Sequence, residues 1–302
     1  MTSLSVGPSS TVSGEQSKFP GSVTALRYTL AALLLLPALL ILMVVFVYPV
    51  FLILLKSFNI PVWGFQNYSS LWSVTGNVLI FRKTLFVALW TTLVCLLIAY
   101  PFAYYVSTQP ARKAKIFLFL SLAPLFTAIL ARLYAWTVIL GRRGVINEFL
   151  MNIGIIDHPL SLLFTPLAVT VGMVHVLLPY MILVLYSVMA KIDPAILEAS
   201  RTLGAGSTQT FWRVFLPLSM RGVYAGTLLV FIVALGFFIT PAVLAGGDHL
   251  TVSVYIEQQI MVLRWGTASA MAAILLTVTV VLFLGFDRLF GAKTLMTGGL
   301  RK

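Results

Sequence analysis

Long apolar stretches without charged residues constrain this chain more than any other feature of its sequence. A helix needs about 20 apolar residues to cross the hydrocarbon core of a bilayer. Six stretches meet this need, and we expect spans at about 28–55, 84–108, 116–140, 163–190, 222–245 and 266–286. The sequence therefore predicts an all-α polytopic membrane protein, with six transmembrane helices in one domain over residues 27–290.

The composition supports the same class. Hydrophobic residues make up 60% of the 302 residues and charged residues only 9%, whereas a soluble domain carries about 25% charged residues. The single cysteine, Cys95, lies inside an apolar stretch, so neither a disulfide nor a cysteine metal site is possible within the chain. We expect no metal site, a disordered cytoplasmic N-terminal tail at 1–26, and a cytoplasmic C-terminal tail at 291–302.

The basic residues predict the orientation of the spans. A net charge of +12 would suggest a nucleic-acid partner in a soluble protein, but here Lys and Arg lie in short segments between apolar stretches, so we expect none. With the N-terminus inside, 13 of the 20 Lys and Arg residues fall on the inner side, six fall outside, and Arg132 lies in a span. Because Lys and Arg mark the cytoplasmic face, both termini are predicted to be cytoplasmic.

The polar segment at 191–221 separates the fourth and fifth predicted spans and therefore faces the cytoplasm. Asp193 is a suitable N-cap and Pro194 suits the first position of a helix, while Gly204 suits its C-terminal end. Ser207 is expected to cap a second short helix, which Pro217 ends or bends. The segment is thus predicted to be two short amphipathic helices joined by a glycine hinge, a rigid docking element.

Within this segment the residues follow a long, fixed spacing. Glu198-Ala199-Ser200 is followed after three residues by Gly204, and nine residues later by Val214, any residue, and Leu216-Pro217. This pattern resembles the EAA motif of bacterial ABC-importer permeases, with Ser200 in place of the second alanine. The stretches LARLYAWTVILGRRGVINEFL, HVLLPYMILVLYSVMAKIDPAILEAS and GFFITPAVLAGG look like the spermidine/putrescine permease subfamily, an inner membrane component of binding-protein-dependent transport systems.

This resemblance implies a type I ABC-importer permease fold in the bacterial inner membrane. It also implies that the glutamate-bearing helix is a coupling helix, seated in a cleft on a cytoplasmic ATPase subunit. The implied partners are a second permease subunit, expected to be a different chain, an ATPase dimer and an external substrate-binding protein. Two alternatives remain open from the residues alone: Glu198 and Arg201 pair on a solvated helix, or both helices lie on the membrane surface.

The chain has no phosphate-binding G-x-x-x-x-G-K-[ST] loop, so the resemblance implies that ATP and Mg are bound by the partner ATPase and that this chain holds no cofactor. A catalytic role is not expected, because no carboxylate pair and no nucleophile–base motif lies in a span. An alternative from another class of transport protein is an ATP-independent secondary carrier. That function would not explain the spacing of residues from Glu198 to Pro217.

Polar groups and glycine–proline breaks within the spans indicate where a substrate path runs. Six residues are expected to contribute to it: Arg132, Trp136, His175, Tyr180, Phe237 and Thr240. Arg132 and Trp136 share one helix face; the alternative is an arginine that extends to the membrane interface. His175 has the alternative role of a hydrogen-bonding group between helices. The proline and glycine residues near Thr240 predict a bend around a cavity, or an ordinary kink.

The resemblance implies a polyamine substrate, spermidine or putrescine, or a similar small amine. A polycation favours carboxylates or aromatic faces along its path, yet no acidic residue lies in a predicted span. Phe237 and Phe238 stand where an acidic residue is expected in relatives. An opine, an aminophosphonate or an amino-acid-like compound therefore remains an alternative substrate.

Overall fold

The computed structural model describes residues 35–60 and 63–288, so the tails predicted at 1–26 and 291–302 lie outside the described residues. Its elements, in chain order, are η1 Met43–Val47, α2 Tyr48–Asn59, α3 Gln66–Ser73, α4 Thr75–Ser107, α5 Ala111–Leu122, η2 Ala123–Phe126, α6 Ile129–Leu140, α7 Val145–Asn152, α8 Pro166–Met189, α9 Pro194–Thr202, α10 Ser207–Thr210, η3 Phe211–Phe215, α11 Leu216–Gly236, α12 Ile239–Leu244, η4 Gly247–His249, α13 Val252–Met261 and α14 Trp265–Phe286.

Five helices in the described residues are long and apolar enough to cross a membrane. They are Leu35–Asn59, Thr75–Ser107, Pro166–Met189, Ser207–Gly236 and Trp265–Phe286. The third predicted span, at 116–140, is not one straight helix: Ala111–Phe126 and Ile129–Asn152 meet at 89°. The break follows the 3₁₀ turn η2, where Pro124 cannot donate a backbone hydrogen bond and Thr127 adopts an extended conformation with ψ of 148°. Counting this bent pair as one span gives the predicted six.

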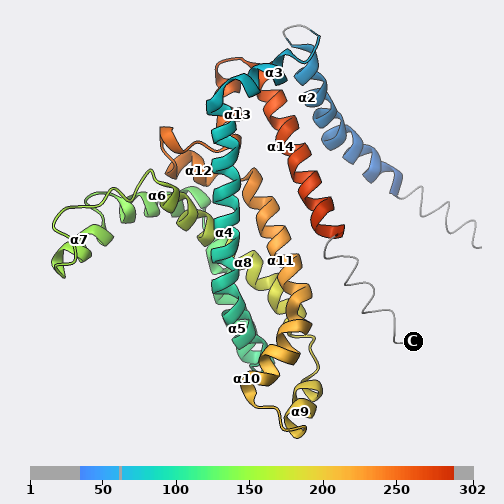
Figure 1. The fold of residues 1–302 in the computed structure, drawn as a ribbon, viewed down its shortest axis with the longest axis vertical. Coiled ribbons are helices and arrows are strands. Elements are labelled where there is room, and N and C mark those ends of the chain that lie inside the picture. Colours follow the sequence, from blue (N-terminus) through green and yellow to red (C-terminus); the bar gives the residue numbers. More distant parts are fainter. Residues whose placement is uncertain (1–34, 61–62, 289–302) are drawn as a thin grey trace, which may run out of the picture. The chain divides into compact units, whose positions relative to one another are not determined.

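The chain divides into two compact units, at 1–52 and 53–302, and the second holds the core. Within it α4, α8 and α11 pack against one another (Figure 1). Small residues allow this close approach: Ala99 and Ala103 of α4 are fully buried. A Cβ atom at Gly222 of α11 would lie 3.0 Å from Cβ of Val188 in α8, so a larger residue there would force these two helices or this valine to shift by a few tenths of an ångström.

The fifth span differs from its predicted form in two ways. The expectation that Ser207 caps a short separate helix is wrong, because Gly206 is the N-cap residue and the helix then continues from Ser207 to Gly236. Pro217 does not end it. The five-residue π-helical segment η3 directly precedes Leu216 and Pro217, and such a segment re-registers the hydrogen bonds that a proline would otherwise interrupt.

The bend predicted near Thr240 does occur. The helix ends at Gly236, Phe237 is extended with ψ of 128°, and α12 begins at Ile239. The range 222–245 predicted for the fifth span therefore contains the end of one helix, a break and a short second helix.

Candidate functional site

The polar segment forms a helix–turn–helix at one end of the α4–α8–α11 core, opposite α3 and α13 (Figure 1). Helix α9 begins as predicted: Asp193 is its N-cap residue and Pro194 its first residue. The backbone N–H of Ala195 donates to Asp193 Oδ1 at 2.9 Å. This bond satisfies one of the free N–H groups at the start of a helix, so the start of α9 is set by its own sequence.

The end of α9 is equally specific. Gly204 has φ of +87°, a left-handed conformation that non-glycine residues resist. Its N–H donates to the Arg201 carbonyl at 2.9 Å, and the Ala205 N–H donates to the Ser200 carbonyl at 3.1 Å. These two bonds define the Schellman motif. The chain therefore turns sharply at the glycine of the motif and leads directly into α10.

A hydrogen bond between hydroxyls ties the two arms of this turn together. Ser200 Oγ lies 2.8 Å from Thr210 Oγ1, and Ser200 Oγ also donates to the Leu197 carbonyl at 2.9 Å. Thr210 is buried, with 4% of its surface exposed. Ser200 is the departure from the family's alanine, and its hydroxyl provides a link that alanine cannot.

An aromatic cluster joins the second arm to the core. Phe215 lies edge-on to Tyr104 of α4 with ring centroids 4.7 Å apart, and Phe211 lies edge-on to Tyr104 at 5.3 Å. Tyr100, one turn before Tyr104, forms a 2.8 Å hydrogen bond with Ser219 of α11. The two tyrosines were not predicted from the sequence. Their spacing of four residues places them on one helix face, but nothing local identifies what that face contacts.

The residues of the motif therefore divide by position. Glu198 and Ala199 of α9 are exposed, Ser200 and Gly204 build the turn, and Val214 and Leu216 are half-buried in the second arm, with Pro217 exposed. Next to the turn, Leu203 is 89% exposed. A rigid turn thus presents an acidic and an apolar side chain outward.

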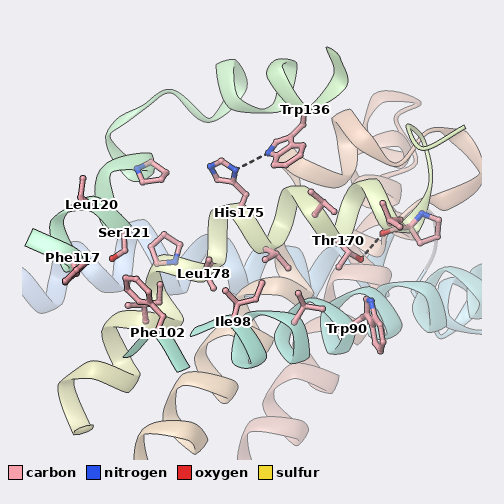
Figure 2. A pocket seen from close by; sticks show the side chains of 18 of the residues that line it. Trp90, Ile98, Phe102, Phe117, Leu120, Ser121, Trp136, Thr170, His175 and Leu178 are labelled. Atoms are coloured by element: carbon pink, nitrogen blue, oxygen red, sulfur yellow. Dashed lines mark hydrogen bonds between the residues drawn. The ribbon is translucent and has the colours of Figure 1, made fainter. Parts of the chain in front are cut away.

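A separate cavity of about 920 Å³ lies between α4, α5, α6 and α8 (Figure 2). Its lining is mostly apolar and aromatic. Two predicted path residues, Trp136 and His175, line it, and the Trp136 Nε1–H donates to His175 Nδ1 at 3.1 Å. His175 therefore forms a hydrogen bond between α8 and α6, as the alternative to a path residue predicted. It also borders the cavity.

The other four predicted path residues do not line this cavity. Tyr180 is exposed and Phe237 is half-buried at the break in the fifth span. Thr240 is fully buried, and its methyl group would lie 2.7 Å from a side chain at Gly172 of α8. Arg132 is half-buried, and its Nε and Nη1 atoms are shielded from solvent without a hydrogen-bond partner. For these four a role in transport stays a prediction.

Several residues of the cavity were not predicted from the sequence. They include Phe86, Trp90, Phe102, Phe117, Ser121 and Thr170. They come from three helices, and single aromatic or hydroxyl residues in an apolar stretch resemble ordinary lipid-facing or packing residues, so no sequence signal distinguishes them. In the described part of the chain, no group of three or more His, Cys, Asp or Glu side chains is placed to hold a metal ion.

Comparison with known proteins finds relatives among transport permeases. No family model matches the chain. Spermidine/putrescine transport system permease protein PotB of Escherichia coli (strain K12) is 40% identical over 197 residues, which cover 65% of this chain and 72% of that protein. PotB of Haemophilus influenzae is 39% identical over 206 residues, 67% of this chain and 72% of its own length. The E. coli inner membrane ABC transporter permease protein YdcU is 29% identical over 231 residues, covering 72% and 73% of the two chains.

Among solved structures, a chain of a bacterial ABC transporter that imports the acidic polysaccharide alginate matches with a TM-score of 0.73 and 18% identity. The match covers 89% of this chain and 97% of that one. At this identity it shows a shared fold. The relatives are transport permeases rather than enzymes, and the chain belongs with them to the permease family of ABC transporters, as a multi-pass membrane component of an importer.

Proposed function

We propose that this permease forms half of the translocation path for a polyamine such as spermidine or putrescine, or a similar small amine. The observation that carries the substrate class is the 40% identity to PotB over 72% of that protein. An opine, aminophosphonate or amino-acid-like substrate is the alternative, because α4, α5, α6 and α8 contain no Asp or Glu to balance a polycation. A different permease chain as the partner would supply such carboxylates.

The proposed coupling element is the turn that contains α9. Two features support this role: its caps and internal hydrogen bonds make it rigid, and Glu198 and Leu203 are exposed on it without a covering element. In the proposed mechanism a separate cytoplasmic ATPase dimer, which binds ATP and Mg, contacts this surface. Closure of the dimer moves α9 and, through the aromatic cluster, α4, so that the path alternates between its two openings.

The orientation follows the same proposal. Contact with a cytoplasmic ATPase requires α9, and both chain termini, to be on the cytoplasmic side of the inner membrane. An external binding protein then delivers substrate from the other side. One structural relative was solved in complex with an alginate pentasaccharide-bound periplasmic protein, which supports an arrangement of this kind.

Co-purification in mild detergent from the native host tests the coupling role. Wild-type chain is expected to bring down an ATPase, and Glu198→Arg is expected to lose it, because the substitution reverses an exposed charge at the contact. Glu148→Arg is the matched control, since Glu148 is exposed on α7, on the opposite predicted side. If no ATPase accompanies the wild type, the ATP-independent carrier becomes the better explanation.

The substrate is tested by uptake of radiolabelled putrescine and spermidine in cells whose other polyamine importers are deleted. Loss of uptake on deleting this permease, and its return with the wild-type gene, is the expected result. Unchanged polyamine uptake would contradict the substrate class and direct attention to amino-acid-like compounds.

A further inference from the structure

The cavity between α4, α5, α6 and α8 has a hydroxyl group at each of its two ends. Between these ends one wall is aliphatic, and the other carries the hydrogen-bonded Trp136 and His175 (Figure 2). Figure 2 shows Ser121 beside Phe117 at one end and Thr170 near Trp90 at the other. Ile98 and other aliphatic side chains lie between these ends. Along the aliphatic wall, this order of polar, apolar and polar groups matches the order of groups in an α,ω-diamine.

Both hydroxyls have already given their hydrogen atoms to the backbone. Ser121 Oγ donates to the Leu118 carbonyl at 2.8 Å, and Thr170 Oγ1 donates to the Pro166 carbonyl at 2.8 Å. The oxygen lone pairs are what remains for a ligand. Ligand N–H groups fit such oxygens, whereas a carboxylate, which carries only lone pairs, does not.

Aromatic rings lie close to each of these oxygens. Phe117 and Phe102 line the cavity toward the Ser121 end, and Trp90 lies toward the Thr170 end (Figure 2). The faces of such rings attract ammonium groups. His175 adds no positive charge, because its Nδ1 accepts the Trp136 N–H at 3.1 Å, and a protonated imidazole has no acceptor nitrogen.

We propose that this cavity is a passage site for the transported amine, in which Ser121 and Thr170 accept hydrogen bonds from its two ends and the aliphatic wall between them contacts its methylene chain. The inference rests on the proposed polyamine function. A volume of about 920 Å³ lies within the range of small-molecule sites. Without a carboxylate the site recovers only part of the lost hydration of an ammonium group, so it binds weakly, as a site along a transport path must.

The test uses the complete transporter, with its partner permease, ATPase and binding protein, reconstituted in liposomes. Uptake of radiolabelled putrescine is measured beside ATP hydrolysis stimulated by the loaded binding protein. The variants are Phe117→Leu and Thr170→Val, which remove a ring face and an acceptor oxygen. Thr170→Val is expected to lower uptake roughly tenfold, the scale of one hydrogen bond to a charged group. Phe117→Leu is expected to lower it by roughly 2- to 30-fold, the scale of one cation–π contact. Stimulated ATP hydrolysis stays within about twofold in both variants.

Matched controls lie on the same kinds of helix outside the cavity. Phe119 is on α5 with Phe117 but is 65% exposed. Thr279 of α14 donates to the carbonyl four residues earlier at 2.8 Å, as Thr170 does. Phe119→Leu and Thr279→Val are expected to transport as wild type.

Three results would overturn the proposal, and they differ in what else they affect. Wild-type uptake by both cavity variants would reject the passage site and leave the polyamine function standing. A parallel loss of uptake and ATP hydrolysis would show that these residues serve packing or coupling instead. Absence of polyamine uptake by the wild-type transporter would reject the substrate class and the passage site together.

Discussion

Replacing Gly204 by alanine isolates the effect of backbone handedness in the proposed coupling turn. A Cβ atom at Gly204 would have no other heavy atom within 4 Å, so the substitution introduces no clash. The cost arises from holding alanine at φ of +87°, which is about 1–2 kcal/mol. A penalty of this size lowers the equilibrium constant between the native turn and its alternatives by roughly 5- to 30-fold, and this factor is the upper limit on the loss of apparent affinity for the ATPase.

Gly206 supplies the control in the same turn. A Cβ atom at Gly206 would also meet open space, but the φ of this residue is −66°. Gly206→Ser keeps a residue that suits the N-cap position, so it is expected to leave affinity unchanged. Gly204→Asn should recover part of the loss, because asparagine tolerates the left-handed conformation better. The assay is titration of the purified ATPase onto permease in nanodiscs, followed by ATP hydrolysis. Equal losses of affinity for Gly204→Ala and Gly206→Ser, or a Gly204→Asn variant that binds more weakly than Gly204→Ala, would refute the reasoning.

Three further predictions concern other contacts. Ser200→Ala and Thr210→Val should each destabilise the turn by about 0.5–1.5 kcal/mol, and hydrogen exchange of α9 in the single and double variants should show a non-additive cycle. Trp136→Phe removes the N–H that donates to His175 and should lower the free energy of unfolding by about 1 kcal/mol, measured by thermal denaturation. An unchanged free energy of unfolding would show that the 3.1 Å hydrogen bond does not stabilise the protein. Asn147→Leu breaks three buried hydrogen bonds of 2.8–3.0 Å to Gly141 and Leu160, so limited proteolysis should cut 141–165 faster than in wild type.

Features set by neighbouring residues were predictable from the sequence. Asp193, Pro194 and Gly204 act within one turn of the helix that they begin or end, and the structure places all three as expected. The spans at 166–189 and 265–286 follow from continuous apolar stretches, whose energetic requirement depends on the bilayer rather than on tertiary contacts.

Features set by distant contacts were not predictable. Pro217 has the local signature of a helix end, yet the helix continues, because Phe211 and Phe215 pack on α4 in the register that η3 provides. Trp136 and His175 are 39 residues apart, and only the bend in the third span brings them together. The cavity depends on that same bend, so its lining could not be derived from helical periodicity.

The unbroken helix from Ser207 to Gly236 makes the fifth span a lever. At a rise of 1.5 Å per residue its 30 residues extend about 45 Å, so a tilt of about 10° at the α10 end displaces the other end by roughly 8 Å. The break at Phe237 is where such a displacement would be delivered. In the proposed coupling, a helix that stopped at Pro217 would instead place a hinge close to α9, and a movement of α9 would not be carried along the span to Phe237.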